Sequence, residues 1–325
     1  MLINPASAGF SSSIAPLIGD TPMVALHFKA EGLTVYAKCE FLNPSGSIKD
    51  RLARAIFDDA ERRGLLRPDS IVLECSSGNT GVALAMLGAA RGYRVQIALS
   101  ERASHERRHL IRQLGGEVIL FPAGGYGTGI SLTREMAGND PRYFLPRQFE
   151  NPLNALDHEE TTGVEILRQA PMPISAFVTG YGTGGTLAGV SRALRRANPQ
   201  TRICAMEPAE AALLWGEAPC LHYIEGVADG FIPKLLEGVL IDEAIKVSSA
   251  DALGMAQRLT REFGLLVGTS SGANVVAALR LAKRAGSGGN VVTLLCDRAE
   301  RYFSTPLFAQ EPATRSSDCA FKGVD

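Results

Sequence analysis

The chain has 325 residues, of which 46% are hydrophobic and 21% are charged, as in an ordinary soluble globular protein. Its 33 Lys+Arg and 34 Asp+Glu residues give a formal net charge of -1, and it has no long basic run, which argues against a nucleic-acid or anionic-membrane surface as its main function. No apolar stretch approaches the roughly 20 residues that span a bilayer. We therefore expect one or two domains, with no nucleic-acid partner and no membrane segment.

The two ends of the chain and its cysteines carry little functional signal. Residues 1–19 lack the pattern of a secretory signal and the arginines of a transit peptide, so residues 1–13 are expected to be a flexible arm. The polar, aperiodic residues 309–325 are expected to be a flexible tail. The six cysteines show no CxxC pair and no metal spacing, so we expect no disulfide framework, no metal site and a reducing, cytoplasmic location.

Short β-rich apolar runs alternate with helical patterns, which predicts α/β units around a mainly parallel sheet. In the first helical pattern Leu52, Ile56 and Ala60 recur four apart, and the pattern stops at Gly64. Residues 124–147 are less regular, and neither a linker nor a repeat is present, so two closely joined α/β lobes are expected. We predict strands at 35–39, 71–75, 94–100, 117–121, 176–179, 203–206 and 290–295. We predict helices at 50–63, 81–90, 105–114, 187–197, 250–263 and 272–284.

Three turns between a strand and a helix are rich in small or hydroxyl residues, and ligands bind at such turns in open α/β sheets. The first, NPSGSIKDR at 43–51, places Lys49 at the start of a helix. An isolated lysine is usually a solvated surface group. The helix dipole at this position, however, opposes a cation and would lower the pKa of the amine, which suits Schiff-base chemistry.

The second turn, ECSSGNTG at 74–81, ends a strand and opens a helix on hydroxyl groups and backbone N–H groups. This arrangement can bind a carboxylate or a phosphate. The alternative is that its serine and asparagine side chains only cap the first turn of the helix. The sequence alone leaves both interpretations open.

The third turn, GYGTGGT at 180–186, can bring several backbone N–H groups to one phosphate, with Thr183 and Thr186 as hydroxyl donors. Residues 180–185 also satisfy G-x-G-x-x-G, and Glu207 lies at a suitable spacing for a ribose contact, so a nicotinamide-dependent dehydrogenase is an alternative. We favour a phosphate cradle for a smaller cofactor, because it accounts for all three turns together.

With four further segments, these turns resemble the pyridoxal-phosphate-dependent β-substituting enzymes of the cysteine synthase and cystathionine β-synthase family, and the motifs are most similar to those of cysteine synthases. The further segments are IGDTP at 18–22, QFENP at 148–152, GTSSG at 268–272, and CDRAERY at 296–302 with Ser304 and Thr305. The resemblance implies two three-layer α/β/α lobes with mainly parallel twisted sheets, which is the fold of the tryptophan synthase β subunit. It also implies pyridoxal 5'-phosphate as the cofactor.

The resemblance implies a role for residues in each motif. Lys49 would form the Schiff base with the cofactor and then remove the α-proton of the substrate. Asn79 would bond to the ring hydroxyl oxygen, and Ser270 would face the ring nitrogen. The residues implied to bind the phosphate are Gly182, Thr183, Gly184, Gly185 and Thr186. Those implied to bind the α-carboxylate of the amino acid are Ser76, Ser77, Gly78, Thr80 and Gln148.

Several of these residues also have a purely structural interpretation. Ser270 and Ser271 could simply cap the following helix. An isolated Gln148 would most often be a surface amide. Cys296 is expected to be a buried packing residue near the cofactor and not a catalytic thiol, and His158 is expected to be structural.

The segment EGVADGFIP at 225–233 departs from the pattern of the family, because Ala228 stands where glycine is usual. The methyl group of Ala228 and the neighbouring Asp229 could narrow the mouth of the site or repel an anionic nucleophile. Relatives that use phosphoserine place an arginine close to this segment, whereas this chain has Tyr-Ile-Glu at 223–225. O-acetylserine is therefore the favoured donor, and Phe231 disfavours a diaminopropionate-forming activity.

The resemblance therefore predicts β-replacement on O-acetyl-L-serine, with sulfide as nucleophile and an α-aminoacrylate intermediate, to give L-cysteine and acetate. The alternatives are cystathionine β-synthase, a β-substituting enzyme that uses another nucleophile, and a non-catalytic regulatory homologue. A homodimer is carried over from the family. A larger cofactor-binding domain is expected at 14–50 and 156–308, and a smaller mobile domain that carries the substrate loop is expected at 51–155.

Overall fold

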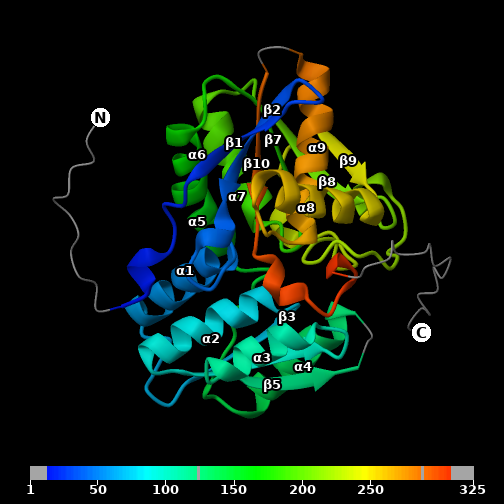
Figure 1. Cartoon of the computed structure of the whole chain (residues 1–325). Coiled ribbons are helices and arrows are strands. Elements are labelled where there is room, and N and C mark those ends of the chain that lie inside the picture. Colours follow the sequence, from blue (N-terminus) through cyan, green and yellow to red (C-terminus); the bar gives the residue numbers. More distant parts are fainter. Residues whose placement is uncertain (1–12, 123–124, 287–288, 309–325) are drawn as a thin grey trace.

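The computed structural model describes residues 13–122, 125–286 and 289–308, and within them the strands form two sheets (Figure 1). The predicted N-terminal arm, except for Ser13, and the predicted tail at 309–325 lie outside the described residues. No helix in the described residues has both the length and the apolar character needed to cross a lipid bilayer.

The larger sheet has six strands in the order β1-β2-β10-β7-β8-β9 among the described residues. β1 and β2 pair antiparallel, and every other neighbouring pair is parallel. In chain order its strands are β1 (Met23–Phe28), β2 (Leu33–Cys39), β7 (Ile174–Gly180), β8 (Arg202–Pro208), β9 (Glu243–Val247) and β10 (Asn290–Leu295).

Helices cover both faces of the larger sheet, because its central strands are apolar on both sides. Successive residues of a strand point to opposite faces: in β7, Val178 packs into the core beneath α8 and α9, whereas Phe177 packs into the core beneath α5, α6 and α7. The helices are α5 (Leu153–Asp157), α6 (Gly163–Gln169), α7 (Gly185–Ala197), α8 (Ser249–Phe263) and α9 (Thr269–Ala285), and a π-helical turn at His158–Thr162 joins α5 to α6.

The smaller sheet is wholly parallel, with four strands in the order β5-β4-β3-β6 among the described residues. One face packs against α1, α2 and α3 through a core that includes Phe57, Leu84 and Ile97, and the other face packs against α4 around Phe121. The elements are α1 (Lys49–Arg62), β3 (Ile71–Ser76), α2 (Asn79–Arg91), β4 (Arg94–Ser100), α3 (His105–Gln113), β5 (Glu117–Phe121), α4 (Tyr126–Asn139) and β6 (Tyr143–Phe144). The prediction of two three-layer α/β/α lobes with mainly parallel sheets is confirmed (Figure 1).

The sequence missed β1, β9, β6, and α4 to α6. The largest omission is α4, whose sequence YGTGISLTREMAGN is rich in glycine and has no clear apolar stripe. Its position depends on tertiary packing: a Cβ atom on Gly129 would lie 2.5 Å from Cys75 Sγ and from Phe121 Cε1. A glycine that weakens the helical pattern in the sequence is therefore what allows the helix to approach the sheet.

The cysteines only partly follow expectation. Cys39, Cys75, Cys204 and Cys296 are free thiols. Cys220 is disulfide-bonded, so not every cysteine of the chain is a free thiol. The spacing of cysteines in a sequence does not show which side chains meet in space.

Candidate active site

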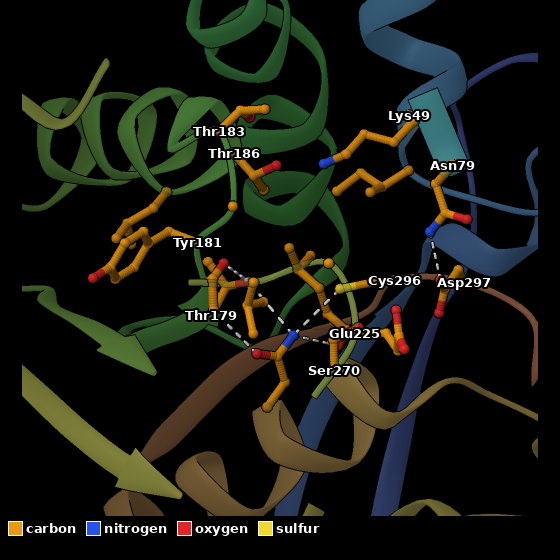
Figure 2. Close-up of a pocket in the computed structure, with 18 of the residues that line it drawn as sticks. Lys49, Asn79, Thr179, Tyr181, Thr183, Thr186, Glu225, Ser270, Cys296 and Asp297 are labelled. Carbon is orange, nitrogen blue, oxygen red and sulfur yellow. Dashed lines mark hydrogen bonds between the residues drawn. The ribbon is translucent and has the colours of Figure 1, made fainter. Parts of the chain in front are cut away.

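A pocket lies where the carboxyl ends of β7 and β10 meet the first turns of α1, α2, α7 and α9 (Figure 2). Helix N-termini carry partial positive charge and unpaired N–H groups, so their convergence favours an anionic ligand. The predicted site residues that line the pocket are Lys49, Ser77, Asn79, Gly182, Thr183, Gly184, Thr186 and Ser270. Those that do not are Ser76, Gly78, Thr80, Gln148 and Gly185.

Lys49 is the first residue of α1, and its half-buried side chain extends into the pocket toward Thr186 (Figure 2). Burial lowers the pKa of its amine, against the opposing effect of the acidic groups of Cys296, Asp229 and Asp297. A lowered pKa increases the neutral, nucleophilic fraction of an amine. The alternative of a solvated surface lysine does not hold.

The glycine-rich turn between β7 and α7 is shaped by close backbone contacts. Gly184 caps the helix with a left-handed φ of +82°. A Cβ atom on Gly185 would lie 2.0 Å from Asn154 Oδ1, and one on Gly182 would lie 2.6 Å from the carbonyl oxygen of Gly226. Asn154 Nδ2 also donates to Thr183 Oγ1 at 2.9 Å. These contacts hold the first turn of α7 at the pocket, together with the hydroxyl group of Thr183 just before it.

His158 supports the same turn from behind. Its Nε2 lies 3.0 Å from Thr186 Oγ1, and its Nδ1 lies 2.8 Å from Thr162 Oγ1. The ring is buried, and burial, assisted by the charge of Arg51, lowers its pKa to about 3. A neutral imidazole with a hydrogen-bond contact at each nitrogen agrees with a structural role for His158, which orients Thr186.

Asn79 is held by the segment that follows β10, at residues 296–302. Its Nδ2 donates to Asp297 Oδ2 at 2.6 Å, and its Oδ1 accepts from Arg301 Nη1 at 2.5 Å. Asp297 also accepts from the hydroxyl of Tyr302, and burial raises the pKa of its carboxyl. The sequence motif CDRAERY signalled this segment, but its link to Asn79 requires the fold.

Ser270 lies in the first turn of α9, where Gly268 is the N-cap and no side chain caps the helix. The interpretation of Ser270 and Ser271 as helix caps is therefore wrong. Cys296 is half-buried at the end of β10, and burial raises the pKa of its thiol to about 12. Asn274 Nδ2 donates to its sulfur at 3.4 Å. A thiol that stays protonated is a poor nucleophile, which agrees with a packing role.

Of the predicted carboxylate-binding residues, Ser77 reaches the pocket, whereas the others form a hydrogen-bonded layer behind it. Thr80 Oγ1 donates to Gln148 Oε1 at 2.7 Å, and Gln148 Nε2 donates to the carbonyl oxygen of Cys75 at 2.6 Å. Ser76 Oγ accepts from the backbone N–H groups of Gly78 and Gly81. The helix-capping alternative thus holds for Ser76. Gln148 is 3% exposed, so it is not a surface amide.

Glu207 does not line the pocket. It is fully buried, and its Oε1 accepts from the hydroxyl of Tyr181 at 2.5 Å and from the backbone N–H of Leu214 at 2.8 Å. Among the described residues its Oε2 has no hydrogen-bond partner, but a fully buried carboxylate outside the pocket is not placed to contact a ribose there. The nicotinamide alternative is therefore wrong, although G-x-G-x-x-G is present.

Residues 14–297 match the family described as pyridoxal-phosphate dependent enzyme. The chain belongs to this family. It is 42% identical over 300 residues to a cysteine synthase of Staphylococcus aureus, with 91% of this chain and 97% of that protein covered. It is 44% identical over 299 residues to an O-ureido-L-serine synthase of Streptomyces lavendulae, with 91% and 92% covered.

The chain is also similar in fold to a solved structure. The O-acetylserine dependent cystathionine beta-synthase from Helicobacter pylori has a TM-score of 0.89 and 35% sequence identity, with 93% of this chain and 100% of that chain covered. The resemblance found in the sequence and the assignment of pyridoxal phosphate as cofactor are confirmed. The protein is an enzyme of this family.

The residues at the pocket fit this cofactor. The amine of Lys49 matches the aldehyde of pyridoxal phosphate, with which an amine condenses to an imine. The first turn of α7, with Thr183 and Thr186, would hold the phosphate at a helix N-terminus. The second N–H of the Asn79 amide and the hydroxyl of Ser270 would remain for the ring.

Proposed function

We propose that this enzyme transfers sulfide to O-acetyl-L-serine, giving L-cysteine and acetate. The observation that carries the proposal is the meeting of three groups at one pocket: the Lys49 amine with its lowered pKa, the glycine-rich first turn of α7, and the serine turn before α2. The resemblance to a cysteine synthase over most of both chains supports this donor and nucleophile.

The role of each residue follows from its position. The bound cofactor supplies the electron sink that lets the α-proton leave and the β-substituent depart. Lys49 removes that proton as the free amine and returns it when the new bond has formed. Ser77 and the backbone N–H groups at the start of α2 bind the substrate carboxylate, and the layer of Ser76, Thr80 and Gln148 keeps this turn in shape.

A second candidate differs in the nucleophile. The S. lavendulae relative is an O-ureido-L-serine synthase, and the H. pylori structure is an O-acetylserine dependent cystathionine beta-synthase. The same donor chemistry with another small nucleophile therefore stays open to test. We also propose a cytoplasmic homodimer, and a smaller domain at 51–155 that closes over the amino acid.

The test is the visible absorbance spectrum of the purified protein before and after addition of O-acetyl-L-serine, followed by sulfide or homocysteine. We expect a Schiff-base band that shifts to longer wavelength when the donor is added, together with release of acetate from the donor. The original band should return fastest with sulfide. A faster return with homocysteine would favour the cystathionine-forming alternative. A cofactor band that the donor does not change would contradict the donor assignment.

Replacement of Lys49 tests its proposed role directly. Lys49→Ala is expected to abolish the Schiff-base band and turnover, because no other amine lines the pocket in the described residues. The control is Lys283→Ala, which removes an exposed lysine from α9 and should leave both unchanged. Substantial turnover by Lys49→Ala would remove Lys49 from its proposed role.

A further inference from the structure

The segment 225–229 brings one carboxylate to the pocket and a second close to its wall. Glu225 lines the pocket directly. Asp229 lies beside it, because its Oδ2 would be 3.1 Å from a Cβ atom on Gly182, one of the lining residues. The side chain of Asp229 also lies near the hydroxyl of Tyr126, which in turn lies near Ser77. Asp229 therefore stands between the proposed phosphate turn and the proposed substrate turn.

The backbone fixes Asp229 in this place. The preceding residue, Ala228, has a φ of +49°, in the left-handed region that favours glycine. Its N–H donates to the carbonyl oxygen of Tyr181 at 2.9 Å, and it is 7% exposed. The departure from glycine seen in the sequence thus lies in a hydrogen-bonded turn, and the carboxylate of the next residue, Asp229, lies close to Gly182.

The acidic groups around the pocket differ in their cationic partners. Glu225 accepts from Arg107 Nη2 at 2.9 Å, and the charge of Arg301 acts on Asp297. Among the described residues, the one cation recorded as acting on Asp229 is Lys49. Under the proposed function this amine is bound to the cofactor in the resting enzyme and later carries the α-proton. Asp229 is therefore the carboxylate whose cationic neighbour changes its charge during the reaction.

We propose that Asp229 makes this enzyme discriminate against negatively charged nucleophiles, so that its acceptor is a small neutral or cationic molecule. This inference rests on the proposed function and deepens it. A carboxylate at the wall of a partly enclosed site repels an approaching anion more strongly than the same group in open water. Among sulfur nucleophiles, uncharged hydrogen sulfide is favoured over dianionic thiosulfate.

The discrimination is expected to depend on pH. Burial raises the pKa of Asp229 to about 6, while the charge of Lys49 and the nearby hydroxyl of Tyr126 act against this rise, and Glu225 adds to it. The buried thiol of Cys75 also lies within the field of Asp229. Since the carboxyl is neutral below its pKa and charged above it, selection against anions should grow as the pH rises through 6.

Three thiols of similar size provide the test: cationic cysteamine, neutral 2-mercaptoethanol and anionic mercaptoacetate. With each, the thiol sulfur bonds to Cβ of the substrate, the bond from Cβ to acetate breaks, and the thiol proton is released to solvent. For each thiol, kcat/KM is measured with O-acetyl-L-serine as donor at pH 5 to 8. Comparing ratios between the wild type and a variant cancels the intrinsic reactivity of each thiol.

We expect Asp229→Asn to raise kcat/KM for mercaptoacetate relative to 2-mercaptoethanol by about tenfold above pH 6, and to lower the relative rate with cysteamine. The pH dependence of the ratio should disappear in Asp229→Asn. If Asp229 had only a structural role, Asp229→Asn would change kcat/KM for all three thiols by the same factor. The control is Glu237→Gln, which removes one exposed negative charge outside the pocket and should leave every ratio unchanged.

The two proposals fail in different ways. If O-acetyl-L-serine releases no acetate from the wild type, the proposed function is wrong. If acetate is released but Asp229→Asn leaves the ratios among the thiols unchanged, the role of Asp229 is overturned while the proposed function stands.

Discussion

Glu74 illustrates how single buried residues support the site from below. It lies in β3, two residues before the strand ends, is 5% exposed, and accepts from the backbone N–H groups of Cys75 at 2.9 Å and Gln148 at 3.0 Å. Burial raises the pKa of its carboxyl to about 7, although these hydrogen bonds favour the charged form. Desolvation therefore outweighs two hydrogen bonds at this position.

The pKa of Glu74 predicts a dependence of stability on pH. A raised folded-state pKa means that the folded protein binds the proton more tightly than the unfolded chain, so the stabilisation is complete below pH 4.5 and is lost as pH rises through 7. The loss is on the order of 3 kcal/mol. In urea unfolding, Glu74→Gln should flatten this part of the pH profile, whereas Glu135→Gln at an exposed site of α4 should not. Identical profiles for Glu74→Gln and the wild type would contradict the assignment.

At the scale of elements, the N-terminus of α7 depends on Gly184, Gly185 and Asn154. Asn154 of α5 fills the space beside Gly185 and also holds Thr183. The helix could not begin at the pocket if residue 185 carried a side chain. By contrast, Gly254 in α8 has nothing within 4 Å of its potential Cβ atom.

This contrast predicts opposite results for two glycine-to-alanine changes. Gly185→Ala should displace Asn154, loosen Thr183 and weaken cofactor binding by tenfold or more, on the order of 1.4 kcal/mol. Gly254→Ala should leave cofactor affinity unchanged and stabilise the fold by about 0.5–1 kcal/mol, because alanine favours a helix over glycine. Cofactor titration of the resolved apoproteins and thermal unfolding measure the two effects. Equal affinities for both variants would show that the packing at Gly185 is unimportant.

At the scale of the whole molecule, a buried ionic cluster joins β2, α1 and α6. Arg51 pairs with Glu40 and with Glu165, each at 2.7 Å, and Lys38 pairs with Glu165 at 2.6 Å. The side chains of Lys38, Glu40 and Arg51 are wholly buried. The cluster ties α1, the helix that begins with the pocket lysine, to the larger sheet.

Breaking this cluster should be costly. Glu40→Ala leaves Arg51 with one carboxylate partner in a dry interior, so we expect a loss of about 3–5 kcal/mol of unfolding free energy. The exposed pair of Arg94 and Glu117 is the control, where Glu117→Ala should cost less than about 1 kcal/mol. Both are measured by urea denaturation. Similar losses in the two variants would contradict the importance of burial.

The sequence by itself determined the class of fold and the chemical groups of the site. Strands 94–100, 117–121 and 290–295 have the bounds that their apolar runs predicted. In 94–100 and 290–295 the run is mostly apolar because the strand is buried on both faces, whereas 117–121 is a partly exposed edge strand. Lys49, the serine turn and the glycine turn were also recognisable, because each combines residue types that a phosphate, a carboxylate or an imine requires within one short segment.

Only the tertiary structure decided which distant residues meet. The contacts of Asn79 with Asp297 and Arg301, the pairing of Arg107 with Glu225, and the approach of Asp229 to Gly182 all join segments far apart in the chain. Local sequence patterns do not encode such contacts, since they arise from the crossing of separate elements. The helix α4 and the burial that shifts the pKa of Lys49 were undecided for the same reason: both depend on what packs around them.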